Sequence, residues 1–371
     1  MVSLEAWLAL RSVKGLSDAT LFRLIQRFGS PEAIQRTSIR DLVQNGLSSS
    51  VAEAIHRGPE REPLGRIRQE LRLVEKGKLS IVSVLDQGYP RRLAMIPDPP
   101  PLLYLTGGWT QADDHALAIV GTRNATPGGS AFTEALSQNL ASLGFTIVSG
   151  LARGIDAAAH RGALKGAGRT VAVLGCGIDR TYPPEHRALR KEIESNGAVL
   201  SELPLGSPPR PYHFPRRNRV ISGLCFGVVV TEATSRSGAL ITARFAVEQN
   251  REVFAVPGAV KEKRHQGPHG LIKQGAKLVE DFRDILEELL PQLDPPFRDR
   301  LRTVEPVQPP SRPDLVGPER EIYEVLSHEP SLVDEILAQA RFSPAEVMSI
   351  LLTLELKGHI RKLPGSHYIR I

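Results

Sequence analysis

Short apolar runs alternate with glycine turns and amphipathic stretches through the middle of this chain. Residues 116–120 are five consecutive apolar residues, and similar runs follow at 145–149, 170–174, 227–231 and 252–256. Each run is typical of a strand that is buried on both faces of a parallel sheet. Because segments with helical spacing separate most of these runs, the pattern predicts an α/β fold with a Rossmann-like, doubly wound and mostly parallel sheet.

The hydrophobic pattern also predicts what surrounds this sheet. Segments 81–85 and 102–105 read as further strands, so the sheet is expected to be larger than a minimal Rossmann domain. We assign residues 64–290 to this extended Rossmann-like domain. A charged linker at 58–63 is expected before it, and the proline-rich residues 291–316 are expected to form an extended linker after it.

Residues 1–60 are predicted to form an all-helical domain with a faint internal repeat. A Gly-Leu-Ser turn ends at Ser17 and again at Ser48, and each serine is placed to cap the helix that follows. The pattern resembles sterile-alpha-motif or helix-hairpin-helix modules, whose hairpin amides contact nucleic acid backbone. Serine replaces the second hairpin glycine in both copies, which favours a structural bundle over a DNA-binding one.

Residues 317–371 are predicted to be a winged helix. Three short amphipathic helices precede a hairpin that turns at 364–366. The helix at the recognition position carries Glu346 and Glu355 against only Lys357, which disfavours strong binding in the major groove. Protein contact is at least as well supported as DNA contact.

Composition narrows the function without deciding it. The chain of 371 residues has a net charge of +6 and a pI near 9.4, which fits a polyanion partner and equally fits a basic surface. Cys176 and Cys225 are the only cysteines, so neither a disulfide framework nor a zinc site is indicated. No signal peptide or membrane span is expected, and we expect a cytoplasmic protein.

Three basic turns at the predicted sheet edge indicate an anion site. Arg123 and Arg153 each follow a strand, and the segment 210–219 carries four arginines with Tyr212 and Phe214 among them. Arginine donates to phosphate in a planar fork, and aromatic rings stack with bases. Either arginine alone is better read as a salt-bridged surface residue, and either ring alone as core. Together, on one edge with few acids, they favour an oligonucleotide backbone.

The sequence lacks the motifs of common nucleotide enzymes. No P-loop, nucleophile elbow or paired histidine metal spacing occurs, and the glycine turn at 175–177 has Arg180 where a dinucleotide fingerprint has its third glycine. Asp156 and Glu232 are the acids expected near the crevice. Asp156 is read as a first-turn helix residue and Glu232 as a partner that holds an arginine. No catalytic residue, metal or cofactor is expected.

Taken together, these motifs resemble the DprA (DNA processing protein A, Smf) family of bacteria over roughly residues 80–290. The segments that carry the resemblance are 118–123, 149–156 with His160, 214–219, 231–233, 237–242 and 257–258. Members commonly add an N-terminal helical domain and a C-terminal winged helix. The resemblance implies a protein, not known as an enzyme, that binds and protects single-stranded DNA and loads RecA onto it in natural transformation and recombination.

The resemblance also implies site residues. The dimer surface of the Rossmann-like domain would fall near His269 and Leu278. The single-stranded DNA pocket would comprise Gly121, Thr122, Arg123, Ser149, Gly150, Arg153, Phe214, Arg216, Arg217, Asn218 and Arg219.

A nucleotide-cleaving enzyme of the lysine-decarboxylase-like or phosphoribohydrolase type is the alternative. Those enzymes resemble this domain in fold and carry a PGGxGTxxE loop. The comparable turn here, 234–240, lacks the double glycine and the following glutamate. Only residues 127–129 resemble the loop, and they follow a different strand, so the binding protein is favoured.

Overall fold

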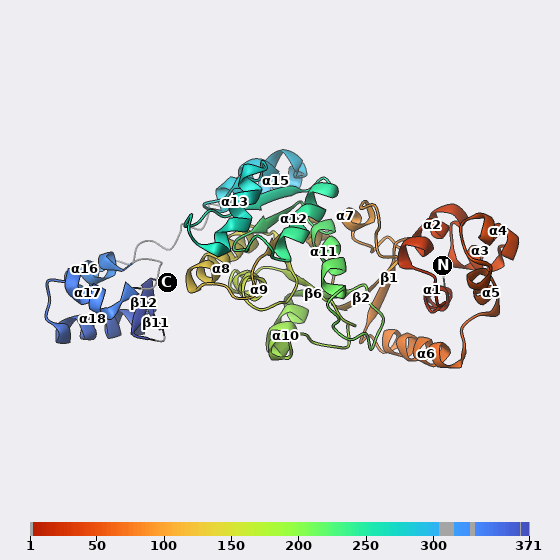
Figure 1. The fold of residues 1–371 in the computed structure, drawn as a ribbon, viewed down its shortest axis with the longest axis horizontal. Coiled ribbons are helices and arrows are strands. Elements are labelled where there is room, and N and C mark those ends of the chain that lie inside the picture. Colours follow the sequence, from red (N-terminus) through yellow and green to blue (C-terminus); the bar gives the residue numbers. More distant parts are fainter. Residues whose placement is uncertain (1–2, 304–314, 327–330, 364, 371) are drawn as a thin grey trace.

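A computed structural model describes residues 3–303, 315–326, 331–363 and 365–370. Within these residues the central sheet has nine strands in the order β1-β2-β6-β5-β4-β3-β7-β8-β9 (Figure 1). Strands β3 to β9 run parallel, and β2 pairs antiparallel with both β1 and β6 at one edge. The strands are β1 (Ser80–Ser83), β2 (Leu102–Gly107), β3 (Ala116–Val120), β4 (Thr146–Ser149), β5 (Thr170–Val173), β6 (Gly197–Ser201), β7 (Gly227–Val230), β8 (Glu252–Ala255) and β9 (Lys277–Leu278).

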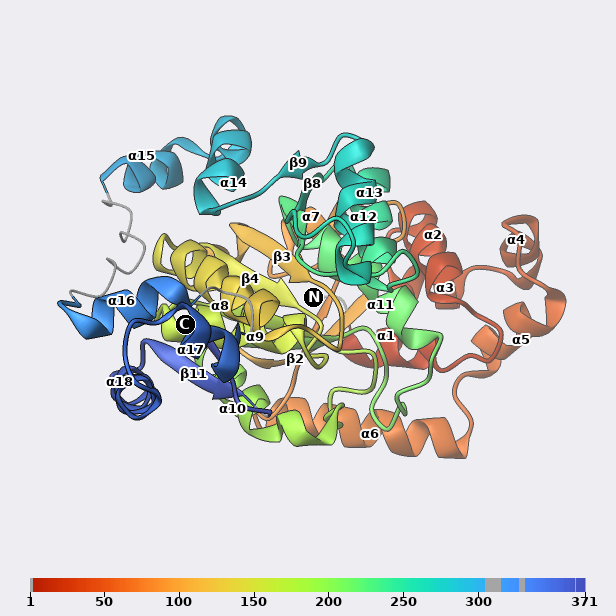
Figure 2. The same ribbon diagram turned by 60° about the vertical axis from the view of Figure 1, so that its left-hand side comes forward.

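Helices cover both faces of this sheet, as a doubly wound fold requires. Apolar residues of α8, α9, α10 and α14 pack on one face and those of α11 and α12 on the other. Figure 2 shows the ribbons of these helices from a second side. The helices of this domain are α7 (Arg91–Ala94), α8 (Pro127–Ser142), α9 (Ile155–Lys165), α10 (Arg187–Asn196), α11 (His213–Gly223), α12 (Ala239–Glu248), α13 (Gln266–Lys273), α14 (Phe282–Leu289) and α15 (Pro295–Thr303). Short 3₁₀ turns η1 (Gln111–Asp114), η2 (Pro184–His186), η3 (Lys263–His265) and η4 (Leu290–Gln292) join them.

The predicted N-terminal bundle is present, and the two predicted capping serines are confirmed. Ser17 and Ser48 accept hydrogen bonds from the N–H groups of Thr20 and Val51 and so cap their helices. The helices are α1 (Leu4–Arg11), α2 (Asp18–Phe28), α3 (Pro31–Arg36), α4 (Ile39–Gln44), α5 (Ser49–Arg57) and α6 (Arg61–Glu75). Helix α6 begins inside the segment that was expected to be a linker.

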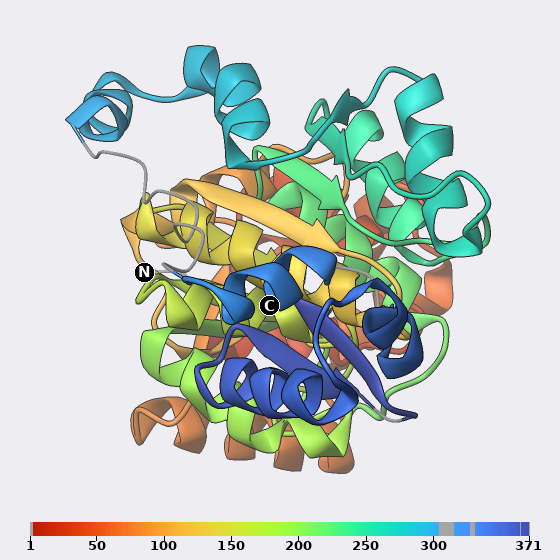
Figure 3. The same cartoon turned by 90° about the vertical axis from the view of Figure 1, so that its left-hand side faces the viewer.

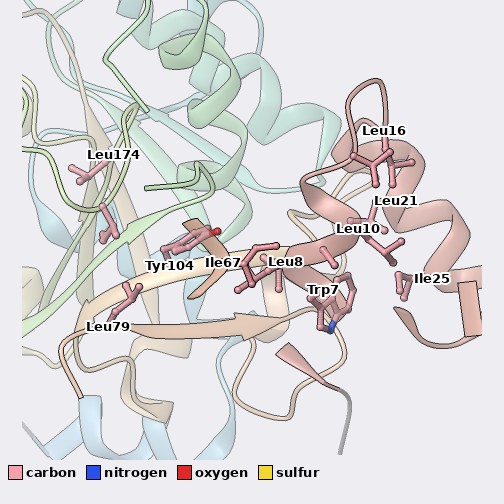
Figure 4. Packing of buried hydrophobic residues seen from close by; sticks show 14 of the residues in the cluster. Trp7, Leu8, Leu10, Leu16, Leu21, Ile25, Ile67, Leu79, Tyr104 and Leu174 are labelled. Carbon is pink, nitrogen blue, oxygen red and sulfur yellow. The ribbon is translucent and has the colours of Figure 1, made fainter. Parts of the chain in front are cut away.

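The N-terminal helices share a core with the sheet. Figure 4 shows Trp7 and Leu10 of α1 in the same cluster as Ile67 of α6 and Tyr104 of β2. All four side chains are at most 4 % exposed. Burial of this apolar surface fixes the bundle against the sheet edge formed by β1 and β2.

One expectation about the connections was wrong, and two elements were missed. The proline-rich segment is not extended throughout, because it contains η4 and α15. Phe297 of α15 packs between His115 and Phe145, and the His115 and Phe297 rings stack at 3.9 Å. Strand β6 and helix α10 were not predicted, although Ala198-Val-Leu200 has the same apolar character as the other strands. Residues 304–314 of the expected linker lie outside the described residues.

The C-terminal unit has its own core and the predicted winged-helix elements. It faces the viewer in Figure 3, coloured blue. Ile322, Ile336, Leu351 and Tyr368 are among its buried residues. Its elements are α16 (Pro318–Val325), β10 (Ser331–Leu332), α17 (Val333–Gln339), α18 (Pro344–Leu356), β11 (Ile360–Leu363) and β12 (His367–Arg370), with strand order β10-β12-β11. The predicted hairpin turn includes residue 364, which lies outside the described residues.

No helix among the described residues is both long and apolar enough to cross a lipid bilayer.

Candidate functional site

The order of the strands reverses between β3 and β7, and a cleft opens at their carboxyl ends. The chain proceeds from β3 through β4 and β5 to β6 on one side, then returns to place β7 on the other side of β3. Open α/β sheets bind their ligands at such a switch point. We call this hollow of about 570 Å³ the switch-point cleft. Its lining includes Gly121, Thr122, Arg123, Ala152, Asp156, Tyr182, Phe214, Arg217, Asn218, Ser237, Gly238 and Thr242.

The turn after β3 presents Arg123 to this cleft. Gly121 is required there, because a Cβ atom would lie 2.6 Å from Cγ1 of Ile155 and 2.8 Å from the carbonyl oxygen of Glu232. Arg123 is exposed, and its guanidinium carbon lies 5.4 Å from the centroid of the Phe214 ring. Among the described residues it has no ion-pair partner, so its charge is available to a ligand.

The turn after β4 is closed by a carboxylate of the protein itself. Asp156 accepts hydrogen bonds from the N–H groups of Gly150 (3.1 Å) and Ala152 (3.3 Å). Burial raises the pKa of Asp156, and the neighbouring Arg217 acts against this rise. Ser149 is fully buried and donates to the carbonyl of Ile119. Side chains on this turn therefore support the cleft wall, and Asp156 has the predicted first-turn position in α9.

Arg217 and Asn218 border the cleft but are held by backbone carbonyl groups. Arg217 is 5 % exposed and donates to the carbonyl oxygens of Gly150 (2.8 Å) and Val173. Asn218 donates to the carbonyl oxygen of Gly238. These bonds tie α11 to the ends of β4, β5 and the loop before α12.

Arg216 and Arg219 point away from the cleft, contrary to the expectation that all of 214–219 faces one anion site. Arg219 is 5 % exposed and pairs with the buried Glu202 at 2.5 Å. Arg216 pairs with Asp18 of α2 at 2.5 Å. Arg219 neutralises the buried Glu202, and Arg216 joins Arg11 in pairing with Asp18, so neither guanidinium is directed at the cleft.

Aromatic rings line the mouth of the cleft beside Arg123. Phe214 packs on Gly175, where a Cβ atom would lie 2.8 Å from its ring, and the Tyr182 ring lies 5.5 Å from Phe214. Tyr182 is 40 % and Tyr212 is 60 % exposed, as a surface for stacking requires.

Arg153 is exposed nearby and forms an ion pair with the exposed Glu185. Sequence reasoning missed Tyr182, although an aromatic residue before proline in a polar loop was a usable signal.

Among the described residues no arginine pairs with Glu232, so that expectation was wrong. Its carboxylate accepts hydrogen bonds from the N–H and the hydroxyl of Thr126, the residue that caps α8. The carboxylate lies so close to Gly129 that a Cβ atom there would be 2.3 Å from its oxygen. A phosphate at this helix N-terminus would meet the negative charge of Glu232. Residues 127–129, the only part that resembles the loop of nucleotide-cleaving enzymes, border a hollow of about 650 Å³, but this carboxylate caps the helix N-terminus there.

The two predicted dimer residues lie on neighbouring elements at one end of the sheet. His269 belongs to α13 and its Nε2 atom lies 3.1 Å from the carbonyl oxygen of Gly258. Leu278 belongs to β9, the last strand in the sheet order, and is 40 % exposed. Their role in a dimer stays a prediction.

Comparison with known proteins agrees with this architecture. Residues 80–290 match the family described as DNA recombination-mediator protein A, and residues 306–366 match the DprA winged helix domain. The chain belongs to the DNA recombination-mediator protein A family. The first match runs from the start of β1 to the end of α14. It therefore contains every residue that lines the switch-point cleft.

Relatives of this family cover the chain from end to end. Protein Smf of Escherichia coli is 37 % identical over 100 % of this chain and 96 % of its own length. DNA processing protein DprA of Streptococcus pneumoniae is 44 % identical over 57 % of this chain and 74 % of its own. The helical and winged-helix parts are therefore shared with the first of these relatives.

Solved structures of the family have the same fold. The X-ray structure of DprA from Streptococcus pneumoniae superimposes with a TM-score of 0.69 at 35 % identity and covers 78 % of this chain and 99 % of that one. A DprA structure from Helicobacter pylori, described as showing a single-stranded DNA binding mode, gives a TM-score of 0.53 at 30 % identity over 58 % of this chain and 98 % of that one.

Proposed function

We propose that this chain binds single-stranded DNA in the switch-point cleft and does not itself catalyse a reaction. The observation that carries the proposal is Arg123, an exposed and unpaired cation beside the Phe214 ring at the carboxyl ends of the parallel strands. A guanidinium binds phosphate while the rings of Phe214 and Tyr182 stack with bases, a combination suited to a flexible strand of any sequence. Family membership and the DNA-binding description of the Helicobacter pylori relative support it.

In this proposal the predicted site residues divide into two groups. Arg123, Arg153 and Phe214 contact DNA directly, with backbone amides of Gly121 and Thr122 beside them. The remaining predicted residues, Ser149, Gly150, Arg216, Arg217, Asn218 and Arg219, build the wall that holds the first group in place.

The experiment is a titration of fluorescent oligo-dT with the wild type, Arg123→Ala and Arg161→Ala at two salt concentrations. Loss of a charge-assisted phosphate contact is expected to weaken binding about ten-fold or more and to reduce the salt slope by about 0.7. Arg161 is an exposed arginine of α9 outside the cleft, and its removal is expected to change little. Equal affinity of Arg123→Ala and wild type contradicts the proposal, as does preference for a duplex of the same length.

We further propose that the protein acts as a dimer through the surface near His269 and Leu278 and loads RecA on the bound strand in the cytoplasm during transformation and recombination. Exposure of Leu278 at the sheet edge supports the first part, and family membership supports the second. Sedimentation equilibrium tests the dimer, and RecA filament formation on DNA coated with single-strand binding protein tests the loading. A monomer at micromolar concentration contradicts the proposed dimer. Failure to accelerate RecA filament formation contradicts the proposed loading.

A further inference from the structure

A second hollow lies next to the switch-point cleft and belongs to none of the sites considered so far. It has a volume of about 380 Å³ and lies between the end of α6, the turn before β1 and the first half of α10. Figure 2 shows α6 and α10 along the same lower edge of the molecule. We call it the α10 groove. Its lining includes Leu73, Lys78, Thr106, Ile178, Asp179, Thr181, Arg187, Arg190, Lys191, Glu194 and Leu205.

The α10 groove and the switch-point cleft share one wall. Thr181 lines the groove and its neighbour Tyr182 lines the cleft. Arg190 holds this wall from behind, because it donates to the carbonyl oxygens of Ile178 and Arg180, both at 2.6 Å. The cleft and the groove are therefore adjacent at the segment that carries Thr181 and Tyr182.

The groove carries a net positive charge, because Lys78, Arg187, Arg190 and Lys191 line it against the carboxylates of Asp179 and Glu194. Lys78, Arg187 and Lys191 are all exposed, and none of them has an ion-pair partner among the described residues. Neither carboxylate of the lining forms an ion pair with these three cations among the described residues. Glu194 accepts from Arg190 and from the hydroxyl of Thr106, and Asp179 accepts from a backbone N–H.

The position of these cations in α10 is opposite to what helix stability favours. Arg187 is the first residue of α10 and Lys191 lies one turn later, whereas the first turn has no acid and the last turn no basic residue. The N-terminus of a helix carries partial positive charge, so cations there repel it and an anion is attracted. The two side chains therefore do not stabilise α10, and their charge is directed at the groove.

We propose that single-stranded DNA leaving the switch-point cleft continues through the α10 groove, where Arg187, Lys191 and Lys78 bind its phosphates. The proposal rests on the function proposed above and adds a second segment to the path of the strand. The lining of the groove has flexible ammonium and guanidinium groups and no aromatic ring on which a base could stack. Its contacts are therefore expected to be with phosphates, and this segment of the path is expected to have no sequence preference.

The test compares oligo-dT of two lengths by fluorescence anisotropy at several salt concentrations. The shorter, about 6 nucleotides, suffices for the cleft alone, and the longer, about 20 nucleotides, also reaches the groove. The variant is Arg187→Ala/Lys191→Ala, and the matched control is Arg161→Ala/Arg283→Ala, which removes two exposed arginines of α9 and α14 outside both hollows. Thermal unfolding is expected to show that the groove variant is at least as stable as the wild type.

The expected result is selective for length. The groove variant keeps the affinity of the wild type for the short oligonucleotide, loses most of the extra affinity for the long one, and has a salt slope that is smaller by about 1.4 for the long one only. The control variant behaves as the wild type with both. An unchanged long-oligonucleotide affinity overturns the groove while leaving the cleft intact, and an equal loss at both lengths also overturns it. If the wild type binds neither oligonucleotide, the proposed function itself is wrong.

Discussion

His160 shows how one buried side chain makes stability depend on pH. Its Nδ1 atom lies 2.7 Å from the hydroxyl of Thr170, and that hydroxyl donates to the carbonyl of Ile147. The ring must therefore donate from Nδ1, which leaves Nε2 without a partner in a fully buried site. Burial, together with the neighbouring His186, Arg217 and Arg161, lowers the pKa of His160 to about 3.

From this depressed pKa we predict a loss of stability on mild acidification. Below the ordinary histidine pKa near 6.5 the unfolded chain binds a proton that folded His160 does not, so the free energy of unfolding falls as pH falls towards 3. The contribution lost between pH 6.5 and 5 is up to about 2 kcal/mol. Urea unfolding at pH 7 and pH 5 measures it. In His160→Leu the difference between the two pH values is expected to shrink by about this amount, and an undiminished difference contradicts the assignment.

At the scale of elements, α8 and α9 pack so closely that one position requires glycine. A Cβ atom on Gly162 of α9 would lie 2.2 Å from the carbonyl oxygen of Glu134 in α8. Backbone atoms cannot move aside as the end of a side chain can. The close approach places α9, whose first turn carries Asp156, against the sheet beneath the cleft.

Gly162→Ala is predicted to lower the free energy of unfolding by roughly 1–3 kcal/mol, because the added methyl group forces the two helices apart. Chemical denaturation measures the change. The matched control is Gly65→Ala in α6, where the added Cβ atom meets nothing within 4 Å. Since alanine is the better helix former, this control is expected to gain roughly 0.5–1 kcal/mol. Similar effects of the two substitutions would show that the helix contact tolerates a methyl group.

At the scale of the whole molecule, an ion-pair network joins the N-terminal bundle to the cleft wall. Asp18, the first residue of α2, pairs with Arg216 of α11 and with Arg11 of α1. Arg216 also approaches Glu202, which pairs with Arg219. Burial disfavours the ionised form of Asp18, but Arg11 and Arg216 outweigh this effect and lower its pKa. The N-terminal bundle thus fixes α11 at Arg216, two residues after Phe214.

Asp18→Asn is therefore predicted to destabilise the protein by roughly 1–3 kcal/mol, less than a fully buried pair would because Arg216 is 42 % exposed. Since the folded pKa of Asp18 is lowered, its contribution is present above the ordinary aspartate pKa and is lost as pH falls through the folded value. Urea unfolding near pH 7 and pH 3 measures both effects.

The matched control for this network is Glu248→Gln, which removes the exposed partner of Arg244 in α12. It is expected to change stability by no more than about 0.5 kcal/mol. If Asp18→Asn is as mild as this control, the network does not fasten the bundle to the sheet.

The amino-acid sequence alone determined the features that depend on neighbouring residues. Strands β3, β4, β5, β7 and β8 follow from short apolar runs, and the helix starts at Ser17 and Ser48 follow from capping by a side chain within three residues. The same holds for Arg123, whose place at the carboxyl end of β3 is set by the glycine turn that precedes it. Such signals are local, so they can be read without knowing the fold.

Only the tertiary structure decided which arginines face the cleft. Arg216, Arg217 and Arg219 stand almost side by side in the sequence, yet they bond to Asp18, Gly150 and Glu202, partners that lie 198, 67 and 17 residues away. The helix directs neighbouring side chains to different faces, and a buried carboxylate or carbonyl group attracts whichever guanidinium reaches it. For the same reason the closure of the α8 N-terminus by Glu232, 106 residues from Thr126, was not readable from the sequence. Local pattern predicts where a side chain stands along the chain, and only the packing of distant segments determines what it binds.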